Sequence, residues 1–514
     1  MLDSSFGKAG KVLTEQINVN HYQVASISNL VLLDDGKIIA AGTAGDNFNG
    51  YYDDGVIARY LPDGSIDKMY GNNGIVYTDY KGASNNISDI KKQTSGKIIA
   101  LGTAYPSDSH TVYYLDRYNT NGSADSLFAG NSRLILPSSA YSITIQPDDE
   151  IIVCGEMING NKQTYAIKVR RYNKNGKIDS TFGINGLATV QLGSKQVFNS
   201  YPIVALDNLQ RIVIGCYNTF NNIKSNGITV LRLTNQGHID STFNKTGIAV
   251  GSALYTPSYF SALCIQPDNK ILVGSFTSAT NDFMINRFNE NGTTDKGFGS
   301  NGIAKTDFTA PGRNASDDYI KAFGIQADGK IIAAGYGVKS GTSDTYFTIA
   351  RYLPNGNADS SFGFGNGKTI TQVEPYEARA NAVIVQPNGS ILSGGYSIKN
   401  DGINGSYSYF TLVRYLKEKR IAKLAADKVS QTKNKIDIVQ TSIILYPNPA
   451  KDVLFLKGLP ATPVPYQLIN DNGIILQSSV VSNARINVSA LKAGIYYLKI
   501  RENKKTVVLK FEKH

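Results

Sequence analysis

Tryptophan is absent from this chain of 514 residues, and methionine, histidine and cysteine are rare. Three cysteines are an odd number and give no disulfide framework. Cys154, Cys216 and Cys264 lie within or beside apolar strand-like runs, so we expect them to be small buried hydrophobic residues. The four histidines stand alone in their neighbourhoods, which argues against a local zinc site or a Ser-His-Asp arrangement. We therefore assign no catalytic residue, metal ligand or cofactor from the sequence.

Long hydrophobic runs are also missing. No stretch reaches the roughly 18 apolar residues that a membrane-spanning helix needs, so we expect no transmembrane segment. No charged segment followed by an apolar stretch stands at the N-terminus either. The chain as given thus shows no signal peptide, and we expect that one has been removed if the protein is secreted.

The net charge of +11 is distributed unevenly. Residues 417–514 hold 17 Lys and Arg against 7 Asp and Glu, a net charge of +10, which leaves 35 against 34, or +1, for residues 1–416. A nucleic-acid-binding domain needs a basic stripe on its own surface. Because the excess lies in the last hundred residues, we expect no nucleic-acid partner.

Glycine and tyrosine are abundant, with 49 and 31 residues, which favours short strands joined by turns. An apolar segment such as "KIIAAG" recurs seven times, beginning at Ile38, Ile98, Ile151, Ile212, Ile271, Ile331 and Ile391. A tight turn such as "DDGK" precedes it, a third strand ending in Arg and a large apolar residue follows, and "D-x-x-F-G-x-x-G" leads to a fourth strand. Seven repeats of four antiparallel strands predict an all-β, seven-bladed β-propeller with the "KIIAAG" strand inside each blade.

These motifs resemble the delta-60 repeat family of β-propellers, with its "QPDGKI" hairpin and "LDxSFGxxG" ending, over residues 1–416. The resemblance implies a fold and no catalytic constellation, so we expect a protein that is not an enzyme.

An Arg and an Asp recur eight residues apart in six repeats, and we expect each pair to fix a turn rather than to catalyse a reaction. The pairs are Arg59 and Asp67, Arg117 and Asp125, Arg171 and Asp179, Arg232 and Asp240, Arg287 and Asp295, and Arg351 and Asp359.

Arg414 in the seventh repeat has no such partner, because position 422 is Ala422. The N-terminal motif "MLDSSFG" matches the motif that ends the other repeats. We therefore expect the N-terminal segment to complete the last blade and to place Asp3 beside Arg414. In the alternative phasing, each blade begins with the "FGxxG" strand at its inner edge, and residues 11–16 would then lie beside the central channel.

The composition of the sequence changes after residue 416. Residues 417–440 are charged and lack glycine and aromatic residues, which is typical of a linker. Residues 441–514 alternate apolar and polar residues around a "DNG" turn, which predicts a small Ig-like β-sandwich.

This tail resembles the type A C-terminal sorting domain of type IX secretion in Bacteroidota, on "YPNPAKD", "INVSALKAGIYYLKI" and a basic last strand. The matching residues are Tyr446, Pro447, Asn448, Pro449, Asp452, Leu491, Gly494, Tyr496 and Lys499. The resemblance implies export from the periplasm through an outer-membrane translocon, a shuttle protein that binds residues 441–514, and a location outside the cell or on its surface.

The loops between the second and third strands vary in length and are rich in Tyr, Asn, Ser, Asp and Gly. They emerge on the same face as the connections between blades, so this face is either a solvated surface or a binding face for an extracellular glycan or a surface protein. A binding or adhesion module is therefore our leading hypothesis. A polysaccharide-acting enzyme with a site at the central channel and a structural subunit of an outer-membrane assembly stay open as alternatives.

Overall fold

The computed structural model describes residues 1–14, 23–46, 52–107, 110–159, 164–194, 201–218, 227–251, 257–277, 282–308, 317–338, 344–363, 365–374, 376–400, 406–417, 443–457, 459, 464–470, 475–481, 484–502 and 505–513. These residues form strands, turns and irregular segments, without a helix. Accordingly, none of them belongs to a helix with the length and hydrophobicity of a membrane crossing. The chain divides into two compact units, Met1–Lys419 and Arg420–His514.

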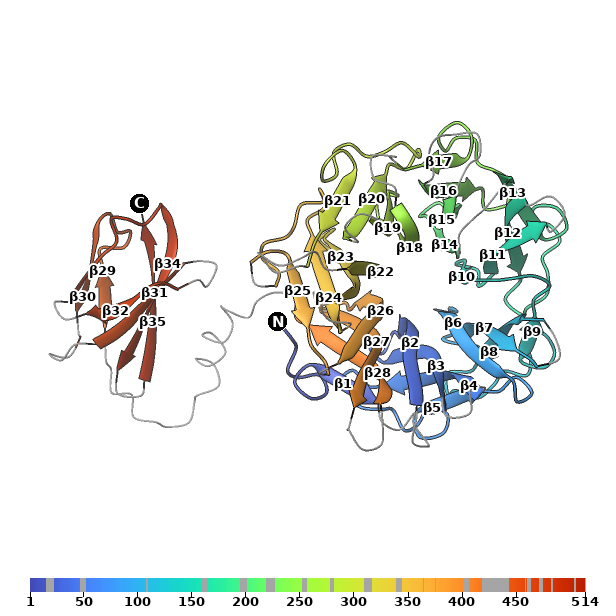
Figure 1. The fold of residues 1–514 in the computed structure, drawn as a ribbon, viewed down its shortest axis with the longest axis horizontal. Coiled ribbons are helices and arrows are strands. Elements are labelled where there is room, and N and C mark those ends of the chain that lie inside the picture. The colour runs from blue at the N-terminus through green and yellow to red at the C-terminus, as the bar shows by residue number, and fades with distance from the viewer. Residues whose placement is uncertain are drawn as a thin grey trace. The chain divides into compact units, whose positions relative to one another are not determined.

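The first unit consists of antiparallel four-stranded groups, named sheets I to VII here in chain order (Figure 1). Sheet I contains β2 (Gln23–Leu32), β3 (Ile38–Asp46), β4 (Tyr52–Tyr60) and β5 (Ile75–Thr78). Sheet II contains β6 (Ser84–Lys92), β7 (Ile98–Tyr105), β8 (Val112–Tyr118) and β9 (Arg133–Ile135). Sheet III contains β10 (Ser142–Ile145), β11 (Ile151–Asn159), β12 (Thr164–Tyr172) and β13 (Leu187–Ser194). Sheet IV contains β14 (Ile203–Leu206), β15 (Ile212–Asn218), β16 (Gly227–Leu233) and β17 (Ile248–Val250).

The remaining three sheets of this unit follow the same order. Sheet V contains β18 (Pro257–Ile265), β19 (Ile271–Thr277), β20 (Phe283–Phe288) and β21 (Ile303–Thr306). Sheet VI contains β22 (Asp318–Ile325), β23 (Ile331–Val338), β24 (Thr345–Tyr352) and β25 (Lys368–Thr371). Sheet VII contains β26 (Glu377–Val385), β27 (Ile391–Asn400), β28 (Ser406–Tyr415) and β1 (Lys11–Thr14). Sheets VI and VII are joined by one parallel bridge, between Thr345 and Glu377.

The N-terminal strand β1 pairs with β28 over Lys11–Thr14, so it occupies the outer edge of sheet VII and not the inner edge. The alternative phasing, with residues 11–16 beside the central channel, is wrong for Lys11–Thr14. The apolar "KIIAAG" strands take the second place in their sheets, between the innermost and third strands, and are almost wholly buried. Both faces of these strands pack against neighbouring sheets, which explains why their apolar residues do not alternate with polar ones.

A bulge recurs in the innermost strands. The pairing of first and second strands shifts by one residue at Ser28, Ser88, Ser261, Lys321 and Asn381. The bulge presses the inner backbone onto the glycine of "KIIAAG": a Cβ added at Gly335 would lie 1.9 Å from the carbonyl oxygen of Tyr319. Glycine is therefore required there by close approach of two backbones.

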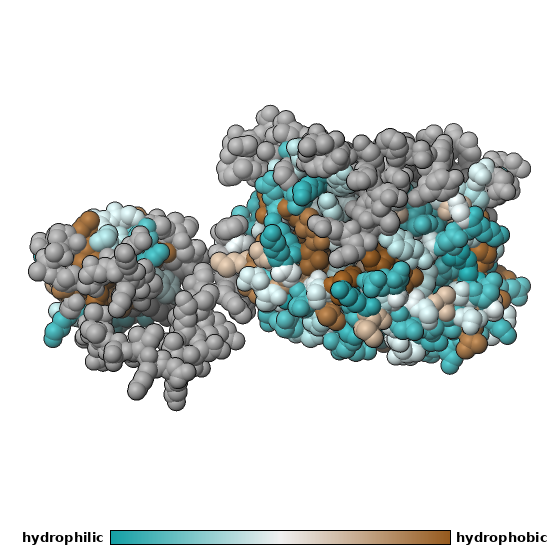
Figure 2. Space-filling model, turned by 90° about the horizontal axis from the view of Figure 1, so that it is seen from below, coloured by the Kyte–Doolittle hydropathy of each residue, from teal (hydrophilic) through white to brown (hydrophobic). Residues whose placement is uncertain are grey.

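The sheets form a ring around a central opening, with the innermost strands facing it (Figure 1). Because the strands are antiparallel, the innermost strand of each sheet begins at the same end of the ring at which the second strand ends. We call this end the loop end. The tight "DDGK"-type turns between these two strands lie at the opposite end. The described outer surface in Figure 2 is mostly hydrophilic, with apolar residues scattered over it.

The second unit has two sheets that share one hydrophobic core. The first sheet contains β29 (Ile444–Tyr446), β30 (Val453–Lys457) and β33 (Arg485–Asn487). The second contains β32 (Ile475–Val481), β31 (Val464–Asn470), β34 (Gly494–Glu502) and β35 (Lys505–Lys513). Leu454 and Leu456 from the first sheet cluster with Leu468, Leu498 and Phe511 from the second.

Candidate functional site

The repeated Arg and Asp meet in every sheet of the ring. Each Arg Nε lies 2.7 to 2.9 Å from its Asp carboxylate, and each Asp backbone N–H donates to the carbonyl of the same Arg. The guanidinium also lies 4.2 to 5.0 Å from the ring centre of a buried Phe, or of Tyr70 in sheet I. Charge and ring stacking together hold the turn that follows the third strand.

The same arginines link neighbouring sheets. In each case Nη1 donates to a backbone carbonyl in the turn that follows the third strand of the next sheet. The acceptors are Thr120, Lys174, Asn235, Glu290, Pro354, Lys417 and Pro62, in chain order of the arginines. The series returns to sheet I, because the last donor is Arg414 and its acceptor is Pro62.

The N-terminal segment completes this pattern in sheet VII. Arg414 Nε donates to Asp3 Oδ2 at 2.9 Å across 411 positions of sequence, and the Asp3 N–H donates to the Arg414 carbonyl. Phe6 lies under the guanidinium, and Gly7 N–H donates to the carbonyl of Asp63 in sheet I.

All seven aspartates share one electrostatic setting. Burial by itself would raise the pKa of Asp3, but hydrogen bonds from Ser5 and the charge of Arg414 outweigh burial and lower it. The pKa is lowered in the other six as well, namely Asp67, Asp125, Asp179, Asp240, Asp295 and Asp359. These carboxylates stay ionised and bound to arginine, so their arrangement stabilises the ring and offers no group for proton transfer.

A cavity of about 840 Å³ lies within the ring, lined by the innermost strands. Small-molecule sites in proteins commonly have volumes of about 300 to 1,000 Å³. Four of the five bulge residues, Ser28, Ser88, Lys321 and Asn381, line it. The bulges therefore determine which side chains face the channel.

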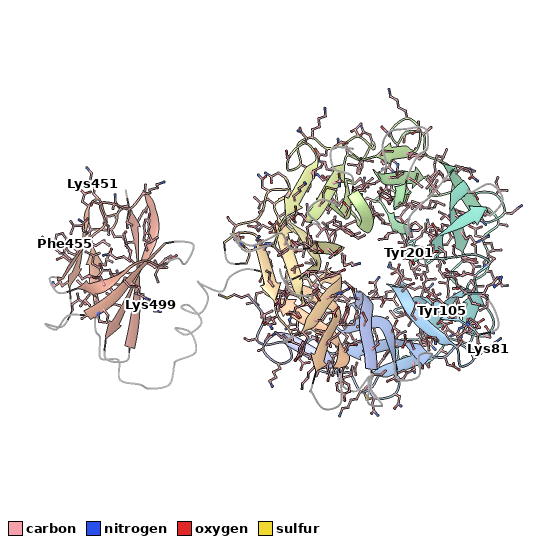
Figure 3. The ribbon with its side chains drawn as sticks, in the orientation of Figure 1. Lys81, Tyr105, Tyr201, Lys451, Phe455 and Lys499 are labelled. Carbon is pink, nitrogen blue, oxygen red and sulfur yellow. The ribbon has the colours of Figure 1, made fainter. Side chains whose placement is uncertain are left out.

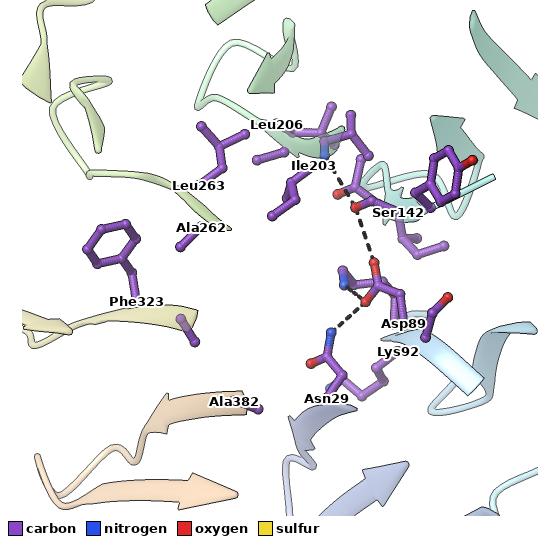
Figure 4. Close-up of a pocket in the computed structure, with 18 of the residues that line it drawn as sticks. Asn29, Asp89, Lys92, Ser142, Ile203, Leu206, Ala262, Leu263, Phe323 and Ala382 are labelled. Carbon is purple, nitrogen blue, oxygen red and sulfur yellow. Dashed lines mark hydrogen bonds and ion pairs between the residues drawn. The ribbon is translucent and has the colours of Figure 1, made fainter. Parts of the chain in front are cut away.

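The part of the cavity wall formed by sheets I to III contains a hydrogen-bonded network around Asp89 (Figure 4). Asn29 Nδ2 donates to Oδ1 at 2.6 Å, and Lys91 is paired with the same oxygen. The backbone N–H of Ile143 and the hydroxyl of Ser142 donate to Oδ2 at 3.0 and 3.3 Å. All of these partners bind one carboxylate, so its charge is compensated within the wall.

The opposite wall, formed by sheets V to VII, presents apolar side chains that include Ala262, Leu263 and Phe323 (Figure 4). Two polar side chains interrupt it, both at bulges. Asn381 donates to the Ile27 carbonyl and to the Ser26 hydroxyl, so it is bound to sheet I. Lys321 is the charged group of this wall among the described lining residues.

Tyrosines gather at the loop end of sheets II to IV. The ring of Tyr141 lies 4.6 Å from that of Tyr201 and 5.9 Å from that of Tyr113, and its hydroxyl donates to Glu156 at 3.3 Å. Tyr201 is 59% exposed and the nearby Tyr105 is 52% exposed; Figure 3 shows both on this side of the ring. Burial raises the pKa of Glu156.

A second cluster lies at the loop end of sheets V to VII. The rings of Tyr319 and Tyr336 stack at 4.8 Å, and the Arg379 guanidinium lies 4.6 Å from the centre of Tyr336. Glu377 pairs with Arg379 at 2.8 Å and accepts a hydrogen bond from Tyr396 at 2.5 Å.

These clusters break the symmetry of the repeats. The cross-strand pair one residue beyond the bulge glycine is Ser26 with Thr43 in sheet I and Asn86 with Thr103 in sheet II. The equivalent pair is Tyr319 with Tyr336 in sheet VI and Arg379 with Tyr396 in sheet VII. At this position sheets I and II carry small polar residues, whereas sheets VI and VII carry aromatic and charged ones.

The histidines and cysteines that the sequence offered do not line the described part of the cavity. His110 and His238 are exposed and do not line the cavity, while His21 and His514 lie outside the described residues. Cys154 and Cys216 are buried as expected, Cys264 is partly exposed, and burial raises the pKa of the Cys216 thiol to about 12.

Three carboxylates that no sequence motif connects lie together between sheets V and VI. Asp282, Asp307 and Asp318 bring ligand oxygens within 4.8 Å of one another, close enough to share a metal ion. They come from three separate segments, so no sequence spacing marks them, and exposed acidic groups also cluster without a metal.

The sorting-signal residues have different positions in the second unit. Tyr446 is exposed and stacks on Phe455, and Pro447, Pro449, Asp452 and Lys499 are also exposed. Asn448 accepts a hydrogen bond from the Glu512 N–H. Tyr496 is buried against Phe511 and donates to the Lys492 carbonyl; Leu491 is half-buried, and Gly494 begins β34.

The expected variable loops lie largely outside the described residues. The structure leaves out 47–51, 108–109, 219–226, 339–343 and 401–405 within them, and 418–440 of the expected linker. The loop end is therefore characterised by the strand ends that surround these segments.

Two family models match the chain. Residues 444–513 match the "Secretion system C-terminal sorting domain". The segments 33–68, 93–128, 146–182, 266–298 and 326–362 match the "Domain of unknown function (DUF5122) beta-propeller". The chain thus carries a C-terminal sorting domain behind repeats of β-propeller type, and such a sorting domain indicates a secreted protein or one attached to the cell surface.

Solved structures with a similar fold are distant. Semaphorin 2a of Drosophila is 8% identical, with 95% of this chain and 96% of that chain covered and a TM-score of 0.42. The GH93 α-L-arabinofuranosidase of Fusarium graminearum is 10% identical, with 64% and 92% covered and a TM-score of 0.37. A mutant of AofleA from Arthrobotrys oligospora is 12% identical, with 65% and 84% covered and a TM-score of 0.37. No curated protein matches the sequence. At these values the likenesses carry no functional argument.

Proposed function

We propose that this protein is a secreted or cell-surface binding module, in which a seven-bladed β-propeller binds an extracellular saccharide at the loop end of its channel. Residues 1–416 form the propeller, with sheets I to VII as blades and β1 closing the last one. Residues 417–440 form a linker, and 441–514 form an Ig-like sandwich that the shuttle and translocon of type IX secretion recognise. The sorting-domain match and the separation of the two compact units support this division.

The observation that carries the binding proposal is the broken symmetry of the channel mouth. Residues that hold the ring together recur in every sheet, whereas the loop-end residues differ from sheet to sheet. Tyrosine faces suit the apolar faces of sugar rings, and the surrounding hydroxyl, amide and carboxylate groups suit sugar hydroxyls. Exposed aromatic rings beside a polar cavity are therefore better explained by a ligand than by stability.

Replacement of Tyr201 tests this proposal. Tyr201→Ala should weaken the binding of the full chain to its saccharide by about tenfold or more, because an exposed ring that stacks on a ligand contributes about 1 to 3 kcal/mol. A saccharide panel followed by calorimetric titration of the best ligand measures this effect.

Tyr77→Ala is the matched control, because Tyr77 is 42% exposed on the outermost strand of sheet I. Equal losses in both variants, or retention of an envelope protein but of no saccharide, would contradict the proposal. Shortened saccharides released by the wild type but not by Glu156→Gln would favour the enzyme alternative instead.

A further inference from the structure

Lys321 brings a positive charge into the cavity, and that charge has no carboxylate partner among the described residues. Its side chain projects from the bulge of β22 into the cavity, where the inner strands surround it although channel water reaches it. No carboxylate of the described residues lies within ion-pairing distance of its ammonium group. Its contact is the face of Tyr336, 5.8 Å from Nζ to the ring centre.

The charges nearby are already paired or repel Lys321. Glu377 is bound to Arg379 and accepts from Tyr396, and Asp89 in the opposite wall is bound to Asn29 and Lys91. Burial, followed by the positive charge of Arg379, lowers the pKa of Lys321. Lys321 is exposed to channel water, and no described carboxylate compensates its charge, so an anion in the cavity would meet an unpaired ammonium group.

The sequence segments beside sheets V and VI add no carboxylate that could pair with this lysine. No Asp or Glu occurs in the four segments that precede or interrupt sheets V and VI and lie outside the described residues. These segments are 252–256, 278–281, 309–316 and 339–343. Comparison with Asn381 supports the same conclusion: at the equivalent bulge one sheet later, that amide is bound to sheet I, whereas Lys321 points its charge into the cavity.

We propose that Lys321 is an anion-binding residue of the channel, and that the saccharide it binds is acidic, with a singly charged oxyanion on the Lys321 ammonium. A uronate carboxylate and a sulfate ester share this chemistry. Among the described lining residues Lys321 is the cation without a carboxylate partner, which matches one negative charge, and the guanidinium of Arg379 is already engaged by Glu377. This inference rests on the proposed function, since it assigns the ligand class of the same channel.

Calorimetric titration of the full chain tests the inference with two matched pairs of probes. The first pair is hexagalacturonate and its methyl ester, and the second is sulfated and unsulfated dextran oligosaccharides of equal length. We expect at least one charged probe to bind about tenfold more tightly than its neutral partner, as one charge-assisted contact predicts. The pair that shows the preference identifies the oxyanion as carboxylate or sulfate.

Lys321→Met should abolish this preference for the charged probe, and Lys321→Arg should retain it. The matched control is Lys68→Met, at an exposed turn position outside the cavity. Persistence of the preference in Lys321→Met, or equal wild-type binding of charged and neutral probes, would overturn the inference but leave the proposed function intact. Binding of no saccharide at all would overturn both.

Discussion

At the residue scale, the arginine of each repeat serves three purposes at once. In sheet I, Arg59 pairs with Asp67, lies over Tyr70, and donates to the Thr120 carbonyl of the next sheet. The eight-residue spacing was sufficient to predict the first contact, because both partners flank one turn. The other two could not be read from the sequence, since they depend on how neighbouring sheets pack.

Replacement of Asp3 tests how much its pair with Arg414 stabilises the ring. The Asp3→Asn variant should lower the free energy of unfolding by about 2 to 3 kcal/mol at neutral pH, because it leaves the buried Arg414 without its counter-charge. The folded-state pKa of Asp3 lies below its ordinary value of 3.8. The stabilisation by Asp3 is thus present above 3.8 and is lost as the pH falls through 3.8 toward the folded pKa.

Urea unfolding at pH 7 and at several lower pH values measures the difference between wild type and Asp3→Asn. The control is Asp34→Asn, since Asp34 is 88% exposed in its pair with Lys92, and such pairs contribute about 0 to 1 kcal/mol. A difference that grows as the pH falls would contradict the assignment.

At the scale of elements, the bulge in the innermost strand connects the repeat motif to the channel. The glycine of "KIIAAG" was predicted only as part of an apolar strand, and its contact with the bulged backbone was not foreseen. Nothing in "DYIKAFGI" marks Lys321 as the bulge residue, because an alternating strand can place a lysine on a solvated face without any shift in register. Which side chains face the channel thus depends on the strand register, which the sequence does not reveal. The existence of the strands could be predicted from the pattern of the sequence.

Substitution of a bulge glycine tests this connection. Gly335→Ala should destabilise the ring by about 2 to 4 kcal/mol, because its Cβ would lie 1.9 Å from the Tyr319 carbonyl oxygen and the backbones would have to separate. The control Gly227→Ala, in strand β16 with its nearest neighbours at 3.8 Å, should change stability by less than about 1 kcal/mol. Chemical unfolding of both variants measures this; similar values for the two would refute the close-contact explanation.

At the scale of the whole molecule, the residues that hold the ring together are distinct from those proposed to bind a ligand. The seven Arg–Asp pairs and the N-terminal strand close the ring, and the opening motif "MLDSSFG" could be predicted to do so because it is the missing end of the last repeat. The asymmetric mouth could not be predicted, because its tyrosines and charged residues come from strands of different sheets. The C-terminal unit adds a sorting domain, which the family model identifies.

The central claim is that the tail places a saccharide-binding ring at the cell surface, and labelling of intact cells tests it most directly. The full chain and a chain lacking residues 441–514 would be expressed behind a periplasmic signal in a bacterium with type IX secretion, then incubated with the fluorescent acidic saccharide preferred in solution. We predict labelled cells for the full chain and unlabelled cells for the truncated chain, although lysates of both should bind the saccharide. Equal labelling of both, or no labelling of cells whose lysates bind, would contradict the account.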